Sequence, residues 1–485
     1  MMFTIAITKL ADMAAGVKLQ QHQIDAVERA KAMPTGGQIL NWRVGGGKTP
    51  GTIAIAEARG GNTLAVVPAS LRENYKGGVK QFTTADRHDK YTVISYEQFS
   101  KDPHGWIDKV KPTTVVADEF HRLRNHGKAR QSFEAVREKI PYLVGATGSL
   151  INNRPEELVP LVNLAAGKDV YKSQAEFSRR HLKTRKVRKP GLMGLFSKER
   201  GTIEEAHRTK ELGKRMGPYV HRFSGTPEFM KNFPTVKEQE VRVNMTPHQE
   251  KLYNSILNKN PGLASKIKNN MPPNKRELQN LNAFSVALRQ ISNDPSSFDT
   301  SVTDKIKASP KFKHMIDEQQ RRMKKDPKFR GVVYSGFLGA GVDPVINAAR
   351  ERGIKATTFT GGLNDRQRKQ TVDDFNSGKL QVLGLSPAGS EGLDLKGVRL
   401  IQLAEGHWNP ERSSQAIGRG VRFKSHLHLH PQHRDVLVQR YLAVKKPSLL
   451  QKMHIRRKET SIDEWIENRR QEKDRLNQEF LGALG

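Results

Sequence analysis

The chain carries the stretch Gln415-Ala416-Ile417-Gly418-Arg419-Gly420-Val421-Arg422, in which two arginines stand three positions apart behind a glutamine and a glycine. This spacing is typical of an arginine finger, a guanidinium that stabilises the charge growing on a phosphoryl group during its transfer. The complementary half of such a site lies far upstream, in the stretch Gly45-Gly46-Gly47-Lys48-Thr49. A chain that holds both halves is expected to fold as two lobes with a phosphate site between them.

Length and composition describe a protein of more than one domain. The 485 residues predict two or three domains, and 36% hydrophobic with 27% charged residues suits a soluble globular chain. The formal net charge of +33 is shared about equally by the two halves of the sequence. Charge of this size and spread favours a polyanion such as nucleic acid as the partner, over a surface that is basic only for solubility.

Cysteine content and apolar runs exclude several classes of protein. Because the sequence has no cysteine, it has no disulfide, no thiolate zinc site and no cysteine nucleophile. The N-terminal apolar run is too short for a signal peptide, and no apolar run approaches the roughly 18 residues that span a bilayer. We therefore expect a cytoplasmic protein without a membrane partner.

Short apolar runs alternate with helical segments in two regions of the chain. Continuous apolar strands separated by helices are typical of a parallel sheet covered on both faces. The predicted strands are residues 64–68, 91–95, 114–117, 142–145, 331–335, 355–360, 381–386 and 398–403. The predicted helices are residues 52–58, 129–139, 344–352 and 366–376. The sequence therefore predicts an α/β fold with two lobes in tandem, residues 1–235 and 236–485.

Two segments break this alternation, and we interpret them as insertions on the lobes. The first, at about residues 165–215, contains the run 179–200 with nine basic residues and one acidic residue. This run is either a solvated flexible loop or a loop that contacts phosphates. The second, at about residues 250–310, contains a predicted helix at 276–291. An amphipathic, charged helix at 462–481 is expected to close the chain.

The glycine-rich stretch has the residue types of a phosphate loop. Gly45, Gly46 and Gly47 let backbone amides approach phosphate oxygens at the start of the following helix. Lys48 is expected to reach the β- and γ-phosphates of ATP, and the Thr49 hydroxyl to bind Mg2+. The strict pattern G-x-x-x-x-G-K-[ST] needs glycine at position 42, where this chain has tryptophan. A glycine-rich turn before a helix, without a ligand, is the alternative.

An acidic pair at the end of a predicted strand strengthens the first interpretation. Asp118-Glu119-Phe120-His121 follows residues 114–117, where a metal-binding carboxylate belongs in a nucleotide-binding α/β fold. Asp118 is expected to hold Mg2+ through water, and Glu119 to polarise the attacking water. At the end of the next strand, Thr147-Gly148-Ser149 is a candidate relay between nucleotide and polymer sites, although such triplets are commonly turns.

Four histidines near the C-terminal end of the second region are spaced like metal ligands: His426, His428, His430 and His433. Because they lack cysteine or carboxylate partners, we interpret them as part of a loop or an edge strand rather than as a metal site.

Together these stretches resemble the superfamily-two helicase-like ATPases, and within them the Swi/Snf branch of DNA translocases. The resemblance extends from about residue 17 to about residue 475 and is closest to minimal viral or phage versions of these motors. It implies two RecA-like lobes, each a parallel sheet flanked by helices. The stretches that carry it are Leu19-Gln20-Gln21-His22-Gln23, Gly45-Gly46-Gly47-Lys48-Thr49, Val66-Val67-Pro68-Ala69-Ser70-Leu71, Val93-Ile94-Ser95-Tyr96-Glu97, Asp118-Glu119-Phe120-His121, Ala146-Thr147-Gly148-Ser149, Leu288-Arg289-Gln290-Ile291, Ser309-Pro310-Lys311, Ser390-Glu391-Gly392-Leu393-Asp394-Leu395, Trp408-Asn409-Pro410 and residues 415–422.

The resemblance also implies a role for individual residues. Catalytic roles are implied for Lys48, Asp118, Glu119, Gln415, Arg419 and Arg422. Contacts to ATP are implied for Gln23, Gly45, Gly46, Gly47, Lys48, Thr49, Gly392 and Asp394, with Thr49 and Asp118 as the Mg2+ ligands. Contacts to nucleic acid are implied for Pro68, Ala69, Ser70, Ser95, Ser149 and Ser390. The sequence departs from the family pattern at Trp42-Arg43, where an acidic pair is usual, and at Ser149-Leu150.

The implied function is an ATP-dependent motor that moves along duplex or branched DNA as a monomer. It would grip phosphates rather than bases, so its binding would be insensitive to sequence and weakened by salt. A helicase that separates strands or drives branch migration is a second reading. A third is an inactive motor fold that only clamps nucleic acid, against which the intact Lys48, Glu119 and Arg422 argue.

Overall fold

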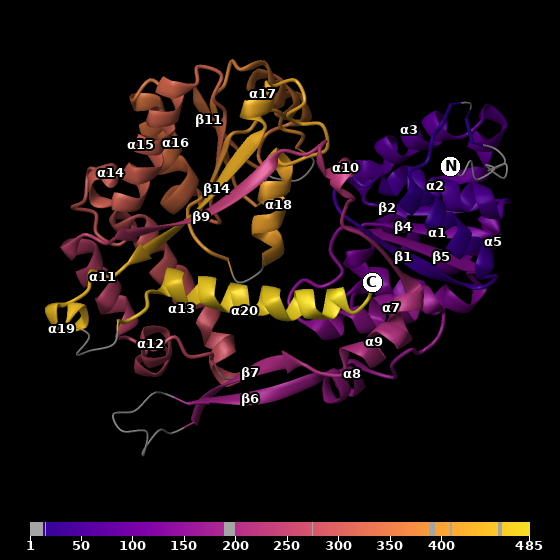
Figure 1. Cartoon of the computed structure of the whole chain (residues 1–485), viewed down its shortest axis with the longest axis horizontal. Coiled ribbons are helices and arrows are strands. Elements are labelled where there is room, and N and C mark those ends of the chain that lie inside the picture. Colours follow the sequence, from indigo (N-terminus) through magenta and orange to yellow (C-terminus); the bar gives the residue numbers. More distant parts are fainter. Residues whose placement is uncertain are drawn as a thin grey trace, which may run out of the picture. The chain divides into compact units, whose positions relative to one another are not determined.

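A computed structural model describes residues 13–14, 16–188, 199–273, 275–387, 393–407, 410–453 and 458–485 of the chain. The chain divides into two compact units (Figure 1). The first unit contains residues 1–183, 205–226 and 475–485, and the second contains 184–204 and 227–474. The sequence analysis instead placed residues 184–204 and 227–235 in the first lobe and 475–485 in the second.

The first unit is built on a six-stranded sheet in which every neighbouring pair is parallel. In spatial order its strands are β3 (Tyr91–Ser95), β2 (Thr63–Val67), β4 (Thr114–Asp118), β5 (Tyr142–Thr147), β1 (Gly36–Trp42) and β8 (Val220–Phe223). The chain therefore crosses the sheet between β1 and β2, with β4 and β5 lying between them. Because all strands run the same way, the residues that follow β1, β4 and β5 meet at one edge of the sheet.

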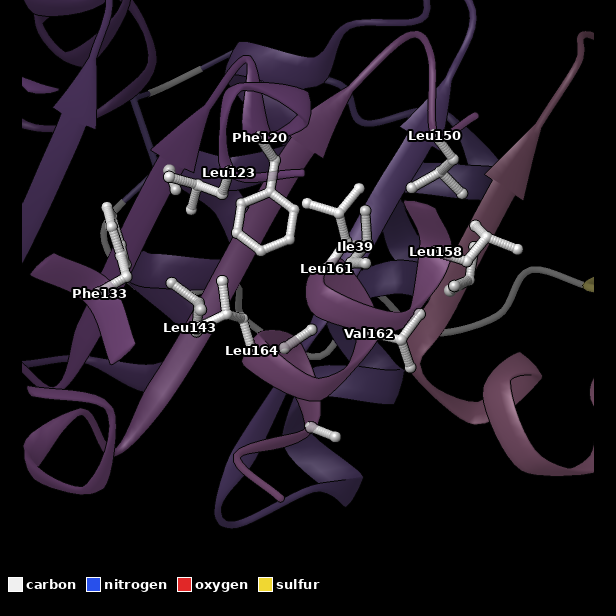
Figure 2. Packing of buried hydrophobic residues seen from close by; sticks show 14 of the residues in the cluster. Ile39, Phe120, Leu123, Phe133, Leu143, Leu150, Leu158, Leu161, Val162 and Leu164 are labelled. Atoms are coloured by element: carbon white, nitrogen blue, oxygen red, sulfur yellow. The ribbon is translucent and has the colours of Figure 1, made fainter. Parts of the chain in front are cut away.

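Helices cover both faces of this sheet (Figure 1). They are α1 (Gln21–Ala32), α2 (Lys48–Arg59), α3 (Arg72–Phe82), α4 (Tyr96–Phe99), α5 (Pro103–Val110), α6 (Lys128–Val136), α7 (Leu158–Ala166), α8 (Gln174–His181) and α9 (Thr209–Met216). Successive strand residues point to opposite faces, so Ile39 and Leu40 enter two different core clusters, and both are fully buried. Figure 2 shows Phe120 packed beside Ile39 and Leu161 in one of these clusters.

The second unit contains another six-stranded parallel sheet. In spatial order its strands are β11 (Ala356–Phe359), β12 (Val382–Leu385), β10 (Gly331–Tyr334), β13 (Leu400–Leu403), β14 (Asp435–Val444) and β9 (Thr235–Asn244). The inner strands are buried on both faces, whereas β9 at the edge is mostly exposed and rich in charge. Charged side chains on an edge strand discourage pairing with other chains.

The helices of the second unit are α10 (Pro227–Met230), α11 (Pro247–Leu257), α12 (Pro261–Lys268), α13 (Lys275–Asn293), α14 (Lys305–Ala308), α15 (Pro310–Lys325), α16 (Asp343–Glu351), α17 (Asp365–Ser377), α18 (Pro410–Gly420) and α19 (Leu449–Lys452). Helices α11, α12 and α13 form the predicted helical insertion. They bury a small core of their own, in which Tyr253 and Leu288 pack with Trp465 from the start of α20 (Ile462–Gly482).

The predicted basic insertion contains a separate two-stranded sheet, β6 (Leu182–Arg188) and β7 (Glu199–Ala206). Within it, Lys183, Arg185 and Lys186 are exposed. The centre of the basic run, residues 189–198, lies outside the described residues, so the choice between a solvated and a phosphate-contacting loop stays a prediction.

The predicted α/β architecture of two parallel sheets flanked by helices is confirmed. The sequence analysis missed six of the described strands: β6 and β7 of the small sheet, and β1, β8, β9 and β14, whose polar residues interrupt an apolar run. Within the residues that the structure describes, no helix combines the length and apolar character needed to cross a bilayer.

Candidate nucleotide-binding site

A glycine-rich turn connects β1 to α2 at the edge of the first sheet. Gly45 and Gly47 have φ angles of 82° and 70°, in the left-handed region that favours glycine. A Cβ atom on Gly46 would lie 3.0 Å from the carbonyl oxygen of Arg43, and one on Gly47 would lie 2.5 Å from Gln23 Nε2. In the described chain, no side chain caps the start of α2. The first N–H groups of this helix are thus suited to bind an anion.

Two side chains of α1 hold the glycine turn from behind. His22 Nε2 lies 2.8 Å from the carbonyl oxygen of Gly46, and Gln23 Nε2 donates to the carbonyl of Gly47 at 3.1 Å. Gln23 Oε1 accepts from the backbone N–H of Gln20 at 2.8 Å. The structure therefore places Gln23, a predicted contact to ATP, on the backbone of the turn. The sequence analysis assigned no role to His22, which also holds the turn. Only its position next to Gln23 in the sequence could have indicated this role.

Trp42, where the sequence departs from the strict pattern, packs against the glycine turn. Its ring is fully buried, and its indole Nε1 donates to His221 Nδ1 at 2.8 Å. Its carbonyl oxygen accepts from Lys48 Nζ at 3.1 Å. His221 lies on β8, far from Trp42 in the sequence, and no residue pattern connects the two. Tryptophan at this position therefore orients the lysine through its backbone and supports the loop through its ring.

Asp118 and Glu119 stand at the end of β4, two strands away from β1. Burial, together with the neighbouring Glu119 carboxylate, raises the pKa of Asp118 to about 6. Tyr96 donates its hydroxyl to the carbonyl oxygen of Asp118 at 2.7 Å. Glu119 has a φ of 52°, which is left-handed and unusual for a residue with a side chain. Such a conformation costs about 1–3 kcal/mol and is typical of functional sites.

His121 joins the acidic pair to the end of the next strand. Its Nδ1 atom lies 3.2 Å from Glu119 Oε2 and 3.1 Å from the hydroxyl of Thr147. Thr147 is fully buried, and its hydroxyl oxygen accepts from the backbone N–H of Ser149 at 3.1 Å. A hydrogen-bonded chain therefore runs from the acidic pair to the Thr147-Gly148-Ser149 turn.

These residues fit a nucleoside triphosphate with Mg2+. The glycine turn packs closely against Arg43 and Gln23, where a Cβ would collide, and Lys48 follows it at the start of α2. Thr49 and Asp118 offer the hydroxyl and carboxylate oxygens that Mg2+ prefers. The raised pKa of half-buried Asp118 indicates a carboxylate whose ionised form would gain from a nearby cation. Bound Mg2+ supplies neutralisation of phosphate charge.

The predicted nucleic-acid contacts of the first unit follow strands of the same sheet edge. Ala69 and Ser70, just after β2, are exposed, whereas Pro68 is buried. Ser95 is also buried, and its hydroxyl accepts from Gln98 N at the start of α4. Ser149 donates its hydroxyl to the carbonyl of Ile151 at 3.3 Å. Of this set, Ala69 and Ser70 are the best placed to meet a polymer.

The second unit brings its own predicted residues together. Arg422 Nη1 lies 3.6 Å from Asp394 Oδ1, and Arg422 Nε donates to the carbonyl of Gly418 at 3.3 Å. Arg419 is half-buried near the end of α18, and its carbonyl accepts from Leu395 N at 3.3 Å. Gln415 is exposed on the same helix.

Five residues of the predicted motifs of this unit lie outside the described residues: Ser390, Glu391, Gly392, Trp408 and Asn409.

The four histidines lie outside strands and α-helices, with His426 and His428 in a turn, as the loop interpretation expects. His426 is buried, with Nε2 2.7 Å from the carbonyl of Val398 and Nδ1 2.8 Å from the hydroxyl of Ser425. Burial lowers the pKa of His426. His433 ends a single helical turn, residues 431–433. In the part of the chain that the structure describes, no three histidine, aspartate or glutamate side chains form a group that could hold a metal ion.

Two domain families match this chain. The SNF2-related domain matches residues 37–297, which is more than half of the sequence, and the helicase conserved C-terminal domain matches residues 320–424. The first match covers the glycine turn and the acidic pair, and the second covers Asp394 and the two arginines.

Full-length relatives are distant in sequence. The "Putative ATP-dependent RNA helicase L538" of Acanthamoeba polyphaga mimivirus is 24% identical over 436 residues, covering 88% of this chain and 89% of the relative. The "Chromodomain-helicase-DNA-binding protein 3 homolog" of Caenorhabditis elegans is 24% identical over 347 residues. That alignment covers 68% of this chain but only 18% of the nematode protein. This mimivirus relative of comparable length is viral, while the phage part of the sequence-based expectation stays a prediction.

A solved structure shares the fold. The Pyrococcus furiosus Hef helicase domain aligns with a TM-score of 0.51 at 15% sequence identity, covering 89% of this chain and 97% of that domain. At this level of identity the likeness supports the architecture of two parallel α/β sheets and nothing finer.

Proposed function

The chain belongs to the SNF2-related family of helicase-like ATPases, and on this premise we propose that it uses ATP hydrolysis to move along duplex DNA. The observation that carries the proposal is the meeting of three motifs at one edge of the first sheet. The glycine turn follows β1, the acidic pair follows β4, and Thr147 ends β5 between them. Hydrogen bonds from His121 tie the last two together.

In this proposal each residue of the first unit has one task. Lys48 binds the β- and γ-phosphates, and the N–H groups at the start of α2 bind the same oxygens. Thr49 and Asp118 hold Mg2+. Glu119 orients the attacking water and accepts its proton. His121 contacts both Glu119 and Thr147 and so links the two residues. Arg419 and Arg422 of the second unit supply guanidinium groups to the transferred phosphoryl group.

Net charge supports nucleic acid as the polymer. The formal charge of +33 suits a partner held through phosphates. Such binding weakens as the salt concentration rises, because the release of counterions from the nucleic acid then gains less free energy. The names of the relatives point both ways, because the mimivirus protein is named an RNA helicase and the nematode protein is named DNA-binding. We propose DNA and test RNA beside it. A monomer stays the expected state.

The first test measures ATP hydrolysis with and without nucleic acid. We expect duplex DNA to raise the rate, and Lys48→Ala to lower it by about 10³-fold or more because phosphate charge loses its nearest cation. Glu119→Gln should lower it by about 10²–10⁴-fold. Lys80→Ala, an exposed lysine on α3, is the matched control and should hydrolyse ATP at the rate of the unchanged protein. Undiminished hydrolysis in Lys48→Ala would contradict the proposal.

The choice of polymer and of movement needs separate assays. ATPase rates against duplex, single-stranded, forked and four-way DNA, with RNA as control, identify the preferred substrate. Displacement of a third strand from a triplex reports movement along a duplex, whereas release of a paired strand reports helicase activity. Nucleic-acid binding without any stimulated hydrolysis would favour the inactive clamp instead.

A further inference from the structure

Directly after Arg422 the chain joins an aromatic cluster that no sequence motif includes. Phe423 stacks on Phe229 with ring centroids 5.4 Å apart and an interplanar angle of 20°, and it meets Phe233 edge-on at 5.8 Å. Phe229 and Phe233 contact each other at 5.4 Å, and both are buried. Aromatic pairs of this kind each contribute about 0.5–1.5 kcal/mol beyond the area they bury. The three rings therefore form one packed group.

Two of these rings come from the segment that enters the second unit. Thr226 is the last residue of the first unit before the chain enters the second unit at Pro227, where α10 begins. We call residues 227–234, between this point and β9, the linker. Phe229 lies in α10, and Phe233 follows it before β9. A backbone bond adds to the ring contacts, because Lys424 N donates to the carbonyl of Asn232 at 2.7 Å. The linker is thus bound by rings and by backbone to the two residues that follow Arg422.

A second set of contacts holds Arg422 from the other side of the turn. Its backbone N–H donates to the hydroxyl of Ser425, and its carbonyl accepts from the backbone N–H of Ser425, both at 3.2 Å. Ser425 contacts His426, whose Nε2 is bonded to the carbonyl of Val398. Because a carbonyl only accepts, Nε2 must carry the proton. This histidine therefore ties the turn to the segment leading into β13.

The backbone of the turn stores strain that these contacts hold in place. Lys424 has a φ of 59°, in the left-handed region. For a residue with a side chain this costs about 1–2 kcal/mol. A strained residue between two anchored segments persists only where the surroundings impose it. The position of Arg422 is therefore set by its neighbours on both sides rather than by α18 alone.

We propose that Phe229, Phe233 and Phe423 are positioning residues, through which the linker between the units sets the place of the Arg422 guanidinium. The inference rests on the proposed function, in which Arg422 stabilises the transferred phosphoryl group. Because the linker and the residue after Arg422 share one packed cluster, a movement of the linker displaces the arginine as well. Misplacement of a catalytic group by about 1 Å can cost about 10²-fold in rate.

The test separates turnover from binding. Phe423→Leu and Phe229→Leu keep an apolar side chain but remove the ring contacts. We expect each to lower kcat for ATP about tenfold to a hundredfold at saturating DNA, with KM for ATP and DNA affinity unchanged. Phe423→Tyr keeps the ring and should keep kcat. Met230→Ala, an exposed position on α10, is the control and should behave as the unchanged protein.

An Arg422→Ala background distinguishes positioning from general destabilisation. If the rings act through the arginine, Phe423→Leu causes no further loss of hydrolysis in that background. A further loss there, or wild-type kcat in both leucine variants while Arg422→Ala is inactive, would overturn the positioning role alone. Wild-type hydrolysis by Arg422→Ala would instead overturn the proposed function of the arginine. Phe423 is changed first because it is only half-buried, so a leucine there leaves the Phe229–Phe233 pair intact.

Discussion

Trp42 stands where the strict phosphate-loop pattern needs glycine, and the glycine turn that follows it packs against this residue. The strict pattern needs a small residue at this position, yet the ring turns away from the glycine turn and into the core. There His22 meets its edge at 4.6 Å, and His22 also stacks on Phe223 at 3.5 Å. The backbone carbonyl of Trp42 remains free to accept from Lys48. In this chain the turn is therefore supported by Trp42, a residue of the sheet strand β1.

Gly51 tests how tightly that ring is packed. A Cβ at this position would lie 2.4 Å from the Trp42 ring, so Gly51→Ala should destabilise the protein by about 1–3 kcal/mol through overpacking. Gly77→Ala is the matched control, because a Cβ on this exposed helical glycine meets no atom within 4 Å. It should stabilise by about 0.5–1 kcal/mol. Urea unfolding followed by circular dichroism measures both, and equal effects would refute the packing argument.

His221 gives the first unit a pH dependence that can be predicted with its sign. Burial, with the charge of nearby Arg29 as a smaller cause, lowers the pKa of His221 to about 4. Its Nδ1 atom must stay unprotonated to accept from Trp42. Between pH 6.5 and 4 the unfolded chain therefore binds a proton that the folded chain does not. Stability is full above pH 6.5 and falls as the pH drops to about 4, by at most about 1.4 kcal/mol per pH unit from this group.

The variant His221→Gln isolates this contribution. A glutamine oxygen can still accept from the Trp42 indole, but it does not titrate. We expect the free energy of unfolding to fall less steeply between pH 6.5 and 4 in this variant than in the unchanged protein. His104→Gln, an exposed histidine at the start of α5, is the control and should leave the slope as it is. Parallel slopes in all three proteins would show that His221 is not the group responsible.

At the scale of elements, a buried polar network joins segments of the second unit that are far apart in sequence. Lys311 at the start of α15 donates to Asp463 at 2.7 Å, to Asn293 at 2.9 Å and to the carbonyl of Ala404 at 3.0 Å. Asn293 in turn donates to Glu405 at 2.7 Å. Helices α13, α15 and α20 and the end of β13 thus share one network. The resemblance had marked Lys311 without indicating what it contacts.

A double-mutant cycle measures the central pair of this network. Lys311 and Asp463 are at most 1% exposed, so removing one partner leaves a buried charge and should cost about 3–5 kcal/mol. The double variant Lys311→Met with Asp463→Leu should cost clearly less than the sum of the single changes. Lys313 and Asp317 form the control pair on the same helix, at 2.6 Å but exposed. Their coupling should stay within about 0.5 kcal/mol. A buried coupling as small as the exposed one would contradict this account.

The elements that the sequence predicts well are those with continuous apolar runs. β3 has the predicted bounds, and β2 differs by one residue at each end, because their side chains alone indicate burial on both faces. β14 was missed because Gln439 and Arg440 interrupt its apolar run. In the structure Gln439 contacts Gln402, and Arg440 contacts Glu238 on β9. These partners lie on other strands, so a local pattern cannot reveal them.

In the candidate site, too, some features can be predicted from the sequence and others cannot. Glycines, an acidic pair and arginines at fixed spacings can be recognised from the sequence alone, since each motif is a few residues long. The contacts that hold the motifs in place join distant segments. Trp42 contacts His221, and Phe423 contacts Phe229, although the residues of each pair lie far apart in the sequence. A local sequence pattern cannot reveal such contacts. The sequence thus indicates which residues could take part in the reaction, whereas the contacts that hold these residues in place can be seen only in the structure.

At the scale of the whole molecule, the C-terminal helix belongs to both units. α20 begins in the second unit, where Trp465 packs in the core of the helical insertion. Its last turns, from Arg475, are assigned to the first unit. There Phe480 is fully buried, and its ring centroid lies 5.6 Å from that of Phe177. Arg222 also donates to the carbonyl of Gly485 at 2.9 Å. The first unit therefore completes its core with residues from the far end of the chain.

Phe480→Ala should consequently weaken the first unit and spare the second. Loss of a buried phenylalanine costs about 3–5 kcal/mol, because the cavity is only partly refilled. Hydrogen exchange read by mass spectrometry resolves the two units. We expect faster exchange in β1 and β8 and unchanged exchange in β10 and β13. Leu449→Ala, a leucine that is 72% exposed on α19, is the control and should change neither. Equal loss of protection in both sheets would show that the two units unfold as one, and unchanged protection in β1 would show that Phe480 does not support the first core.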